Sequence, residues 1–431
     1  MIVKDAVCPF CGCLCDDIEV EVEVESGRVV GVTNACDLGA TKFLGGERLK
    51  TPIRREGKTW KEISYDEAIR YAAEMLLDAE RPLLYGWSGT HGEAQCVGVH
   101  MAELVRGVID NTSSVCHGPS VLAIQEVGHP GCTLGVVKNR ADVVIYWGSN
   151  PIDAHPRHLS RYTCYAEGFF LENSFRDRKV IVVDVRKTRT ANIADEFVMV
   201  RPGGDYAVLS ALRAIVRGKT DTIPPTVAGV TRDQLIRVAD LCLNAKFGAV
   251  YFGLGLTMIP GKNKNVRNAI ELVTELNRHT KFTISAMRGH YNVYGSNEVN
   301  TWMTGYPFAI DFSRGIAFYN PGETTAVDIL ARKECDAALI VGSDPAAHFP
   351  RKCIEHLAEI PVVQLDPYPN ATTAFCSVQI PVAVTGVDAE GTAYRMDGVP
   401  IRTKKVVSSD YLSDEDVLTR MYVLMQEALK R

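Results

Sequence analysis

Hydrophobic and acidic residues alternate over residues 18–25, close to the amino end of the chain. A period of two predicts a half-exposed strand, because successive side chains of a strand point to opposite faces. The Ser26-Gly27 dipeptide then predicts a turn, and the apolar residues 28–32 predict a second strand. We therefore expect a small hairpin over residues 18–32.

Two segments have apolar residues at helical spacing. Ser64, three residues before Glu67, predicts a capping box that opens the first helix. Ser413 is a suitable N-cap for a second helix at the carboxyl end, which we expect to dock on the rest of the protein. The expected inward-facing residues are Ala68, Ile69, Ala72, Ala73, Met75 and Leu76 in the first helix, and Val417, Leu418, Met421, Leu424, Met425 and Ala428 in the second.

An internal repeat is the strongest pattern in the chain. Residues 142–151 recur as residues 336–345, and each copy is an apolar strand that ends in Gly-Ser, then Asn or Asp, then Pro. A second apolar strand follows each copy and ends in Asp184 or Asp366. Short strands ending in Asp also suit any parallel sheet, but two copies in matched order favour two related nucleotide sites.

Composition and charge narrow the class of protein. A length of 431 residues predicts two or three domains. A net charge of −5 gives no basic surface for nucleic acid. We find no apolar run long enough to span a bilayer and no leader segment, so we expect a cytoplasmic protein without a membrane partner.

Five of the 13 cysteines lie before residue 37. The spacing Cys8-x2-Cys11-x3-Cys15-x20-Cys36 supplies four thiolates and leaves Cys13 over, and the hairpin would return Cys36 to the first three. Four clustered thiolates in a reducing compartment predict a [4Fe-4S] cluster. Structural zinc, which also takes four thiolates, stays an alternative, as does the absence of a metal.

A thiol, an imidazole and a glycine stand together at Cys116-His117-Gly118. This combination predicts a site for redox metal chemistry, although buried Cys and His are also common in ordinary cores. Arg288, next to Gly289, can present its planar fork to a carboxylate, or can be a surface cation. The loops after Asp184 offer cations, hydroxyls and backbone N–H groups suited to a diphosphate, and can equally be solvated.

These motifs occur in the order found in the molybdopterin oxidoreductase superfamily, which includes the formate dehydrogenases. The chain most resembles the family formed by the B subunits of formylmethanofuran dehydrogenases from methanogens, over nearly its whole length. The matching motifs are the four spaced cysteines, Val115-Cys116-His117-Gly118-Pro119-Ser120, Gly148-Ser149-Asn150-Pro151 with Ala154-His155-Pro156, Asp184 with Arg186-Lys187-Thr188, Arg201-Pro202-Gly203, and Met287-Arg288-Gly289 with Asn292-Val293.

The resemblance implies an α/β fold with a small β-rich iron-sulfur domain over residues 1–56. Two pseudo-symmetric Rossmann-like domains would follow, one made of residues 57–111 with 289–402 and the other of residues 112–288. Residues 403–431 would form the docking helix. The C-terminal barrel domain of formate dehydrogenases is expected to be absent from this chain and supplied by a separate subunit.

The resemblance also implies roles for single residues. Cys116 would be the thiolate ligand to tungsten or molybdenum, His117 would handle a proton or orient the substrate, and Arg288 would hold formate or CO2. The sequence does not choose between the two metals. Two molybdopterin guanine dinucleotides would be bound by Gly148, Ser149, Asn150, His155, Asp184, Arg186, Thr188, Arg201, Gly203, Asp205, Gly253, Gly255, Gly342, Ser343, Asp344 and Asp366.

One position departs from the family. Many relatives carry a Lys two residues after the last cluster cysteine, on the electron path to the pterin, and this chain has Leu38 there. Lys42 is the nearest substitute.

The resemblance implies an activity and partners. We expect reversible reduction of CO2 to formate within formylmethanofuran synthesis, in a complex with barrel-domain, amidohydrolase-like and ferredoxin-like subunits. Two alternatives stay open: a formate dehydrogenase catalytic subunit of another complex, and an electron-transfer subunit of the same fold that has lost the metal.

Overall fold

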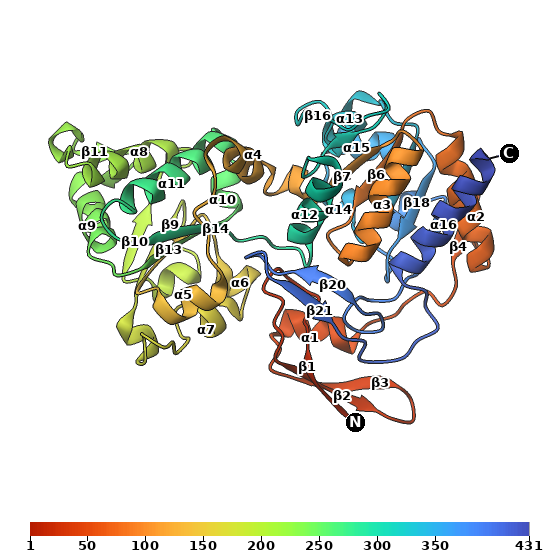
Figure 1. Ribbon diagram of the computed structural model, residues 1–431, viewed down its shortest axis with the longest axis horizontal. Helices are drawn as coiled ribbons and strands as arrows, with labels where there is room; N and C mark the ends of the chain where they lie inside the picture. Colours follow the sequence, from red (N-terminus) through yellow and green to blue (C-terminus); the bar gives the residue numbers. More distant parts are fainter. Residues whose placement is uncertain (431) are drawn as a thin grey trace. The chain divides into compact units, whose positions relative to one another are not determined.

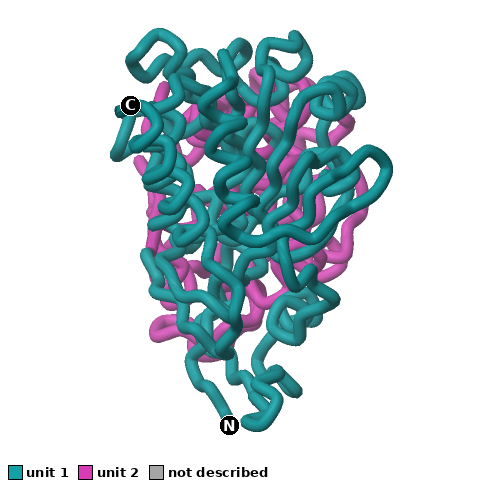
Figure 2. The backbone as a smooth tube through the Cα atoms, turned by 90° about the vertical axis from the view of Figure 1, so that its right-hand side faces the viewer, with its two compact units in different colours: residues 1–115, 290–395, 400–431 teal, residues 116–289, 396–399 magenta. Residues whose placement is uncertain are grey.

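The computed structural model describes residues 1–430 and divides into two compact units, shown in different colours in Figure 2. Unit 1 consists of residues 1–115, 290–395 and 400–431, and unit 2 of residues 116–289 and 396–399. The amino-terminal 56 residues and the carboxyl-terminal helix, which we expected as separate pieces, fall within unit 1.

Unit 1 is built around a sheet that has nine strands among the described residues, in the order β16-β15-β7-β6-β17-β18-β19-β4-β5. The five central strands are parallel, and antiparallel pairs close both edges. The strands are β4 (Ile53–Glu56), β5 (Thr59–Glu62), β6 (Pro82–Gly86), β7 (Val108–Asn111), β15 (Ile310–Asp311), β16 (Phe318–Tyr319), β17 (Ala337–Val341), β18 (Val362–Leu365) and β19 (Val378–Ile380).

Helices cover both faces of this sheet because its central strands are apolar on both sides. The helices are α2 (Tyr65–Asp78), α3 (Gly92–Leu104), α12 (Val293–Thr304), α13 (Ala326–Arg332), α14 (Pro345–His348), α15 (Arg351–Leu357) and α16 (Asp414–Leu429), with short 3-10 turns η1 (Thr112–Val115) and η5 (Thr372–Phe375). The terminal helix α16 packs against α2 and α3 (Figure 1).

Both predicted helices are present, although some of their details differ from the predictions. All six expected inward residues of α2 are buried, and Ser64 accepts the backbone N–H of Glu67 at 3.1 Å. The full reciprocal capping box occurs instead at Ser413 and Asp416, which open α16. The expectation for Ala428 was wrong, because the last turn of α16 is exposed.

The amino-terminal part of unit 1 is a three-stranded antiparallel sheet of β1 (Ile2–Ala6), β2 (Ile18–Glu23) and β3 (Arg28–Thr33), followed by α1 (Asp37–Leu44). The predicted hairpin is therefore confirmed, although its first strand ends two residues before the predicted end. A separate hairpin of β20 (Gly391–Tyr394) and β21 (Pro400–Thr403) also belongs to this unit.

Unit 2 is built around a five-stranded parallel sheet in the order β10-β9-β8-β13-β14. Its strands are β8 (Val143–Trp147), β9 (Lys179–Asp184), β10 (Glu196–Met199), β13 (Gly248–Phe252) and β14 (Phe282–Ala286), beside a two-stranded ribbon of β11 (Thr226–Val227) and β12 (Val230–Thr231). Its helices and 3-10 turns are α4 (Gly118–Val127), α5 (Leu134–Arg140), α6 (Pro151–Ala154), α7 (His158–Tyr162), η2 (Ser174–Asp177), η3 (Thr190–Ile193), α8 (Asp205–Val216), η4 (Thr220–Thr222), α9 (Arg232–Leu243), α10 (Leu254–Thr257) and α11 (Lys262–Leu276).

The two sheets follow one plan. The order β10-β9-β8-β13-β14 of unit 2 corresponds to β19-β18-β17-β6-β7 in unit 1, and the repeated sequence segments supply β8 with β9 and β17 with β18. The chain passes between the units soon after β7 and again soon after β14, which are equivalent strands. Cys116 stands at the first crossing and Arg288 at the second. The mixed α/β fold is confirmed.

Candidate active site

Cys116 lies in the segment between the 3-10 turn η1 and helix α4. Hydrogen bonds hold this segment in place. Strand β7 ends at Asn111, and Ser114 in the 3-10 turn that follows donates its hydroxyl to the buried carboxylate of Asp110 at 2.7 Å. The hydroxyl of Thr257, at the end of α10, donates to the backbone carbonyl of Cys116 at 3.0 Å. His117 is the residue directly before helix α4.

The imidazole of His117 is fixed at both nitrogens. It is 1% exposed, its Nε2 lies 3.2 Å from the carbonyl of Met287, and its Nδ1 lies 3.0 Å from the hydroxyl of Ser120. Because a carbonyl only accepts, Nε2 carries the proton and Nδ1 accepts from Ser120. Burial and the nearby charge of Arg288 lower the pKa of His117 to about 3, so the ring is neutral at pH 7.

Arg288 follows strand β14 and is 6% exposed. Its backbone N–H donates to the carbonyl of Ala286 at 3.0 Å, and its carbonyl accepts the Nε2–H of His155 at 2.9 Å. Burial raises the pKa of the Cys116 thiol to about 12, and the charge of Arg288 acts against this rise. The three residues predicted to be catalytic therefore come together in unit 2.

Sequence reasoning missed His158, which lies on α7 near His155. His158 is fully buried, neither ring nitrogen has a hydrogen-bond partner, and burial lowers its pKa to about 3. Its ring packs edge to face with Tyr251, with centroids 4.7 Å apart. The equivalent residue of the other repeat is Lys352, two places after the Pro that both copies share. The only sequence signal for a special residue was this difference between the copies.

The repeated Gly-Ser turns bring backbones into close contact. Gly148 and Gly342 have positive φ angles of 53° and 55°. A Cβ on Gly148 would lie 2.7 Å from the Cα of Gly255, and a Cβ on Gly342 would lie 3.1 Å from the Cα of Gly89. Close backbones at the carboxyl ends of parallel strands are suited to a bound nucleotide.

The Asn or Asp that follows each Gly-Ser turn has a contact within the chain. The Oδ1 of Asn150 accepts the hydroxyl of Thr190 at 2.7 Å, and the Oδ1 of Asp344 accepts the hydroxyl of Thr372 at 2.6 Å. Each of these bonds ties the end of the first repeated strand to the 3-10 turn that follows the second. The cofactor role of these two side chains stays a prediction. In the structure, each of them holds the 3-10 turn in place.

The remaining predicted cofactor residues of unit 2 follow the carboxyl ends of its strands. The Oδ1 of Asp184 accepts the N–H of Val185 at 2.7 Å. The Oδ1 of Asp205 accepts the indole N–H of Trp147 at 2.7 Å, whereas its buried Oδ2 has no hydrogen-bond partner. Of the others, Ser149 and Thr188 are buried, Gly253 packs against Gly148, and Arg186, Arg201 and Gly203 are exposed. Unpartnered buried acceptors such as this Oδ2 and the Nδ1 of His155 fit a bound polar group such as a pterin nucleotide.

Asp366 directly follows β18 of unit 1, and the buried Ser343 follows the neighbouring strand β17. The Oδ1 of Asp366 accepts the N–H of Tyr368 at 3.0 Å. Burial raises the pKa of Asp366 to about 7, and the positive charge of Lys42 acts against this rise. Lys42, in the last turn of α1, therefore lies within electrostatic range of a predicted cofactor residue.

The amino-terminal cysteines lie together in unit 1. Burial raises the pKa of Cys8, and the charges of Cys15, Cys11 and Cys36 raise it further. A Cβ on Gly39 would lie 2.8 Å from the Sγ of Cys8 and 3.5 Å from that of Cys36, so a side chain at this position would displace the thiol of Cys8.

The thiols of Cys11 and Cys13 influence each other. Cys13 donates a hydrogen bond to Cys11, which lowers the pKa of Cys11. Within residues 1–430, no three Cys, His, Asp or Glu side chains are close enough to share a single metal ion. The [4Fe-4S] cluster, in which each thiolate would bind a different iron, stays a prediction.

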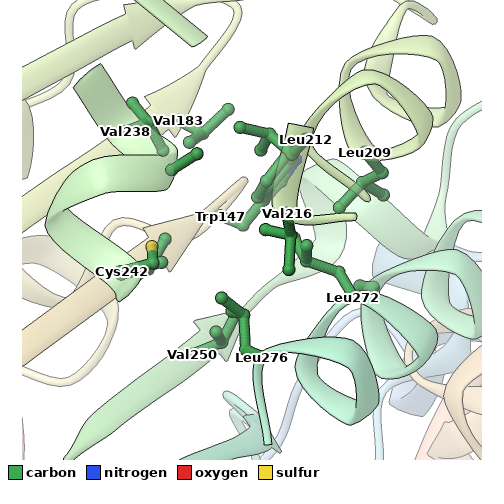
Figure 3. Close-up of a pocket in the computed structure, with 13 residues that line it drawn as sticks. Trp147, Val183, Leu209, Leu212, Val216, Val238, Cys242, Val250, Leu272 and Leu276 are labelled. Atoms are coloured by element: carbon green, nitrogen blue, oxygen red, sulfur yellow. The ribbon is translucent and has the colours of Figure 1, made fainter. Parts of the chain in front are cut away.

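Unit 2 contains a cavity within its hydrophobic core (Figure 3). It has a volume of about 20 Å³ and is lined by apolar core side chains, among them Trp147, Leu212 and Val250. Apolar cavities of this kind stay dry, and the lining offers no group for catalysis.

A family model described as "Molybdopterin oxidoreductase" matches residues 48–416. The chain belongs to the molybdopterin oxidoreductase family. It is 51% identical, over 99% of both chains, to the B subunit of tungsten-containing formylmethanofuran dehydrogenase 2 from Methanocaldococcus jannaschii. The protein of the same name from Methanococcus maripaludis is 47% identical, again over 99% of both chains. The predicted resemblance is thereby confirmed, and so is the assignment to an oxidoreductase family.

More distant relatives share the fold. Formate dehydrogenase H of Escherichia coli is 26% identical over 70% of this chain and 48% of its own length. The crystal structure of the formyltransferase/hydrolase complex from Methylorubrum extorquens contains a chain with a TM-score of 0.73 and 20% identity, which covers 88% of this chain and 100% of its own length. Acetylene hydratase from Pelobacter acetylenicus gives a TM-score of 0.71 at 14% identity, over 98% of this chain and 69% of its own length. Over residues 1–430 we find no helix with the length and apolar character to cross a bilayer.

Proposed function

We propose that this chain is the catalytic subunit that reduces CO2 to formate at a tungsten or molybdenum centre, as a step of formylmethanofuran synthesis in a methanogen. The observation that carries the proposal is the grouping of Cys116, His117 and Arg288 at one place in unit 2. The identity of about half the residues to two formylmethanofuran dehydrogenase subunits supports it.

Each residue has a task that follows from its surroundings. Cys116 would offer its thiolate to the metal, and the loss of a proton from this buried thiol is favoured by the cation of Arg288. The guanidinium of Arg288 would hold the two oxygens of formate in its planar fork. His117 is neutral and held by two hydrogen bonds, so it would orient the substrate or receive a proton at a fixed position.

The bound metal with its two pterin guanine dinucleotides would supply two-electron redox chemistry. The overall change adds two electrons and one proton to CO2 to give formate. Residues Gly148, Gly255 and Asp205 of unit 2 would hold one dinucleotide, through close backbone approach and a free carboxylate oxygen. Gly342 and Asp366 of unit 1 are at the equivalent strand ends and would hold the other.

Electrons would enter through a [4Fe-4S] cluster on Cys8, Cys11, Cys15 and Cys36. The mutual electrostatic influence of these thiols and the glycine at position 39 support this placement. Lys42 would lie on the path from the cluster toward the pterin of unit 1, because its charge reaches Asp366.

This chain would work in the cytoplasm, in a complex with other subunits. A barrel-domain subunit would complete the pterin site, an amidohydrolase-like subunit would use the formate, and ferredoxin-like subunits would deliver electrons. The two relatives are named as subunits, which supports membership of a complex.

The fold alone does not decide the reaction, since similar chains belong to a formyltransferase/hydrolase complex and to an acetylene hydratase. A formate dehydrogenase subunit of another complex would need the same three residues. An electron-transfer subunit without the metal would not need Cys116, His117 and Arg288 together, so their grouping favours catalysis.

Metal analysis of the complex, purified without oxygen, tests the proposal. We expect about four irons and about one tungsten or molybdenum per copy of this chain, after subtraction of the partners' own metals. Iron without either heavy metal, despite full cofactor supply, would favour the electron-transfer subunit. Cys116→Ala should abolish formate oxidation with an artificial acceptor and leave the iron content unchanged.

A further inference from the structure

Two phenylalanines form the tip of a tight hairpin on the surface of unit 2. Gly168 and Leu171 exchange both backbone hydrogen bonds, at 3.2 and 3.0 Å, so Phe169 and Phe170 are the two residues of the turn. Their exposed fractions are 75% and 56%. Turn tips normally carry Gly, Asn, Asp, Ser or Pro. Two exposed aromatic rings at such a tip have no role in the core.

The hairpin is held to helix α5, which precedes it in the chain. The backbone N–H of Phe170 donates to the carbonyl of Asn139 at 3.2 Å, and that of Phe169 donates to the Asn139 side chain at 2.9 Å. A Cβ on Gly168 would lie 2.1 Å from the carbonyl of Lys138, so the hairpin and α5 are in close backbone contact. The backbone that carries both rings is therefore held against α5.

A buried arginine fixes the rest of the loop. Arg178 is 2% exposed, and its guanidinium donates to the carbonyls of Ala166, Ser174 and Lys138. These bonds connect the beginning of the loop, its end and helix α5. A surface that is rigid before binding loses little conformational entropy when a partner arrives.

Further rings and two cations surround the tip. Tyr165 and Phe175 are 47% and 57% exposed and contact each other, with centroids 6.3 Å apart. The guanidinium of Arg140 lies 4.4 Å from the ring of Phe170, and that of Arg176 lies 5.8 Å from the ring of Phe175. Within residues 1–430, neither guanidinium has a carboxylate partner. We name these six residues, Arg140, Tyr165, Phe169, Phe170, Phe175 and Arg176, the aromatic platform.

The aromatic platform lies away from the cofactor residues of its unit. Its hairpin leads through the 3-10 turn η2 into the amino end of strand β9, and α5 leads into the amino end of β8. The predicted cofactor residues follow the carboxyl ends of the same strands. The amino and carboxyl ends of parallel strands lie at opposite ends of the sheet. The platform is therefore not part of the predicted cofactor site.

We propose that the aromatic platform is a docking site for another protein subunit, whose matching surface is apolar and carries carboxylates that pair with Arg140 and Arg176. Aromatic residues and arginine dominate binding energy at protein interfaces, and exposed aromatic patches of this kind mark them. Each of the two guanidinium groups can pair with a carboxylate of the partner at the edge of the apolar contact. The inference rests on the proposed function only in that the chain belongs to a complex.

The test uses the complex purified through a tag on this chain. The variant is Phe169→Ser with Phe170→Ser, and the control is Ile316→Ser, an equally exposed apolar residue of unit 1, 71% exposed. Native mass spectrometry counts each subunit, and dilution gives the dissociation constant of each. We expect at least a tenfold rise in the dissociation constant of one stoichiometric partner for the double variant, and no change for Ile316→Ser. Arg140→Gln should raise the dissociation constant of the same partner and make that constant less dependent on salt concentration.

The outcomes separate the two proposals. If the unaltered chain purifies alone, membership of a complex fails. If the unaltered chain and the double variant purify with the same partners and the same dissociation constants, the docking inference fails. Loss of a second copy of this chain, rather than of a different subunit, would also overturn it.

A folding defect is checked independently. The melting temperature of the double variant should stay within a few degrees of that of the unaltered chain. If it does not, a photo-crosslinking phenylalanine analogue at position 169 replaces the variant. An adduct with an acidic peptide of a stoichiometric subunit supports the proposal, and absence of any adduct to another subunit overturns it.

Discussion

The ring of His155 donates a hydrogen bond to the backbone carbonyl of Arg288 over 2.9 Å, and both groups are buried. This bond fixes the backbone from which the proposed substrate-holding guanidinium extends. The neighbouring carbonyl, that of Met287, is bound by His117. Two neutral imidazoles thus hold two consecutive carbonyls, at the point where strand β14 ends.

Loss of the His155 bond should weaken formate binding. His155→Leu leaves the carbonyl of Arg288 unpaired, and we expect the KM for formate to rise about tenfold, since a buried hydrogen bond is worth about 1–1.5 kcal/mol. The matched control is His129→Leu, which removes a similar bond of 2.7 Å to the carbonyl of Ile284 on the same strand. Both variants should lose stability, and only the first should change KM. Equal KM values would contradict a positioning role for His155.

The shape of the Arg288 side chain should matter as well as its charge. Arg288→Lys keeps a positive charge and loses the two-pronged geometry, so we expect the KM for formate to rise by at least tenfold. Metal content should not change. Steady-state kinetics with an artificial acceptor measures the effect. Unchanged kinetics would remove Arg288 from the proposed site.

The contact between Gly255 and Gly148 should not tolerate a side chain. A Cβ on Gly255 would lie 2.6 Å from the Cα of Gly148, whereas a Cβ on Gly289 would meet nothing within 4 Å. We expect Gly255→Ala to lower the free energy of unfolding by about 1–3 kcal/mol, because backbone atoms would have to move apart. Gly289→Ala should have little effect. Denaturant titration of the two variants compares them, and equal stabilities would contradict the close approach.

His158 should make the protein sensitive to acid. Its pKa is lowered from 6.5 to about 3 by burial, so the folded chain keeps the ring neutral while the unfolded chain binds a proton below pH 6.5. Stability due to this ring is therefore lost as the pH falls from 6.5 toward 3. We expect His158→Phe to reduce the loss of stability between pH 7 and pH 4.5 by about 2–3 kcal/mol. Parallel pH profiles of the two proteins would show that this ring does not titrate on unfolding.

The cysteines should differ in their effect on iron. Cys15→Ser should cost most of the about four irons of the proposed cluster, because each cubane iron needs one ligand. Cys13→Ser should keep them, since Cys13 donates to Cys11 and is not needed as a ligand. Iron analysis and the visible absorption of the cluster check both. Loss of iron with Cys13→Ser instead would exchange the roles of these two cysteines, and zinc in place of iron would favour the structural site.

The local elements and the repeat follow from the amino-acid pattern alone. The alternation after Ile18 fixed a strand, and the apolar spacing after Ser64 fixed a helix, because both depend only on side chains close together in the chain. The two Gly-Ser turns indicated two related halves, because residues 142–151 recur as residues 336–345. Motif order was enough to indicate the family.

Which distant residues come into contact depends on the packing of the folded chain. His155, His117 and Arg288 come from three separate segments, and local spacing contains no record of which strands become neighbours in a sheet. His158 was invisible in the sequence because its lack of a hydrogen-bond partner is a property of its surroundings. Arg178 holds the loop of Phe169 and Phe170 through bonds to distant carbonyls, which the sequence does not reveal. Burial and long-range contact arise from the packing of distant segments, and a linear pattern cannot specify them.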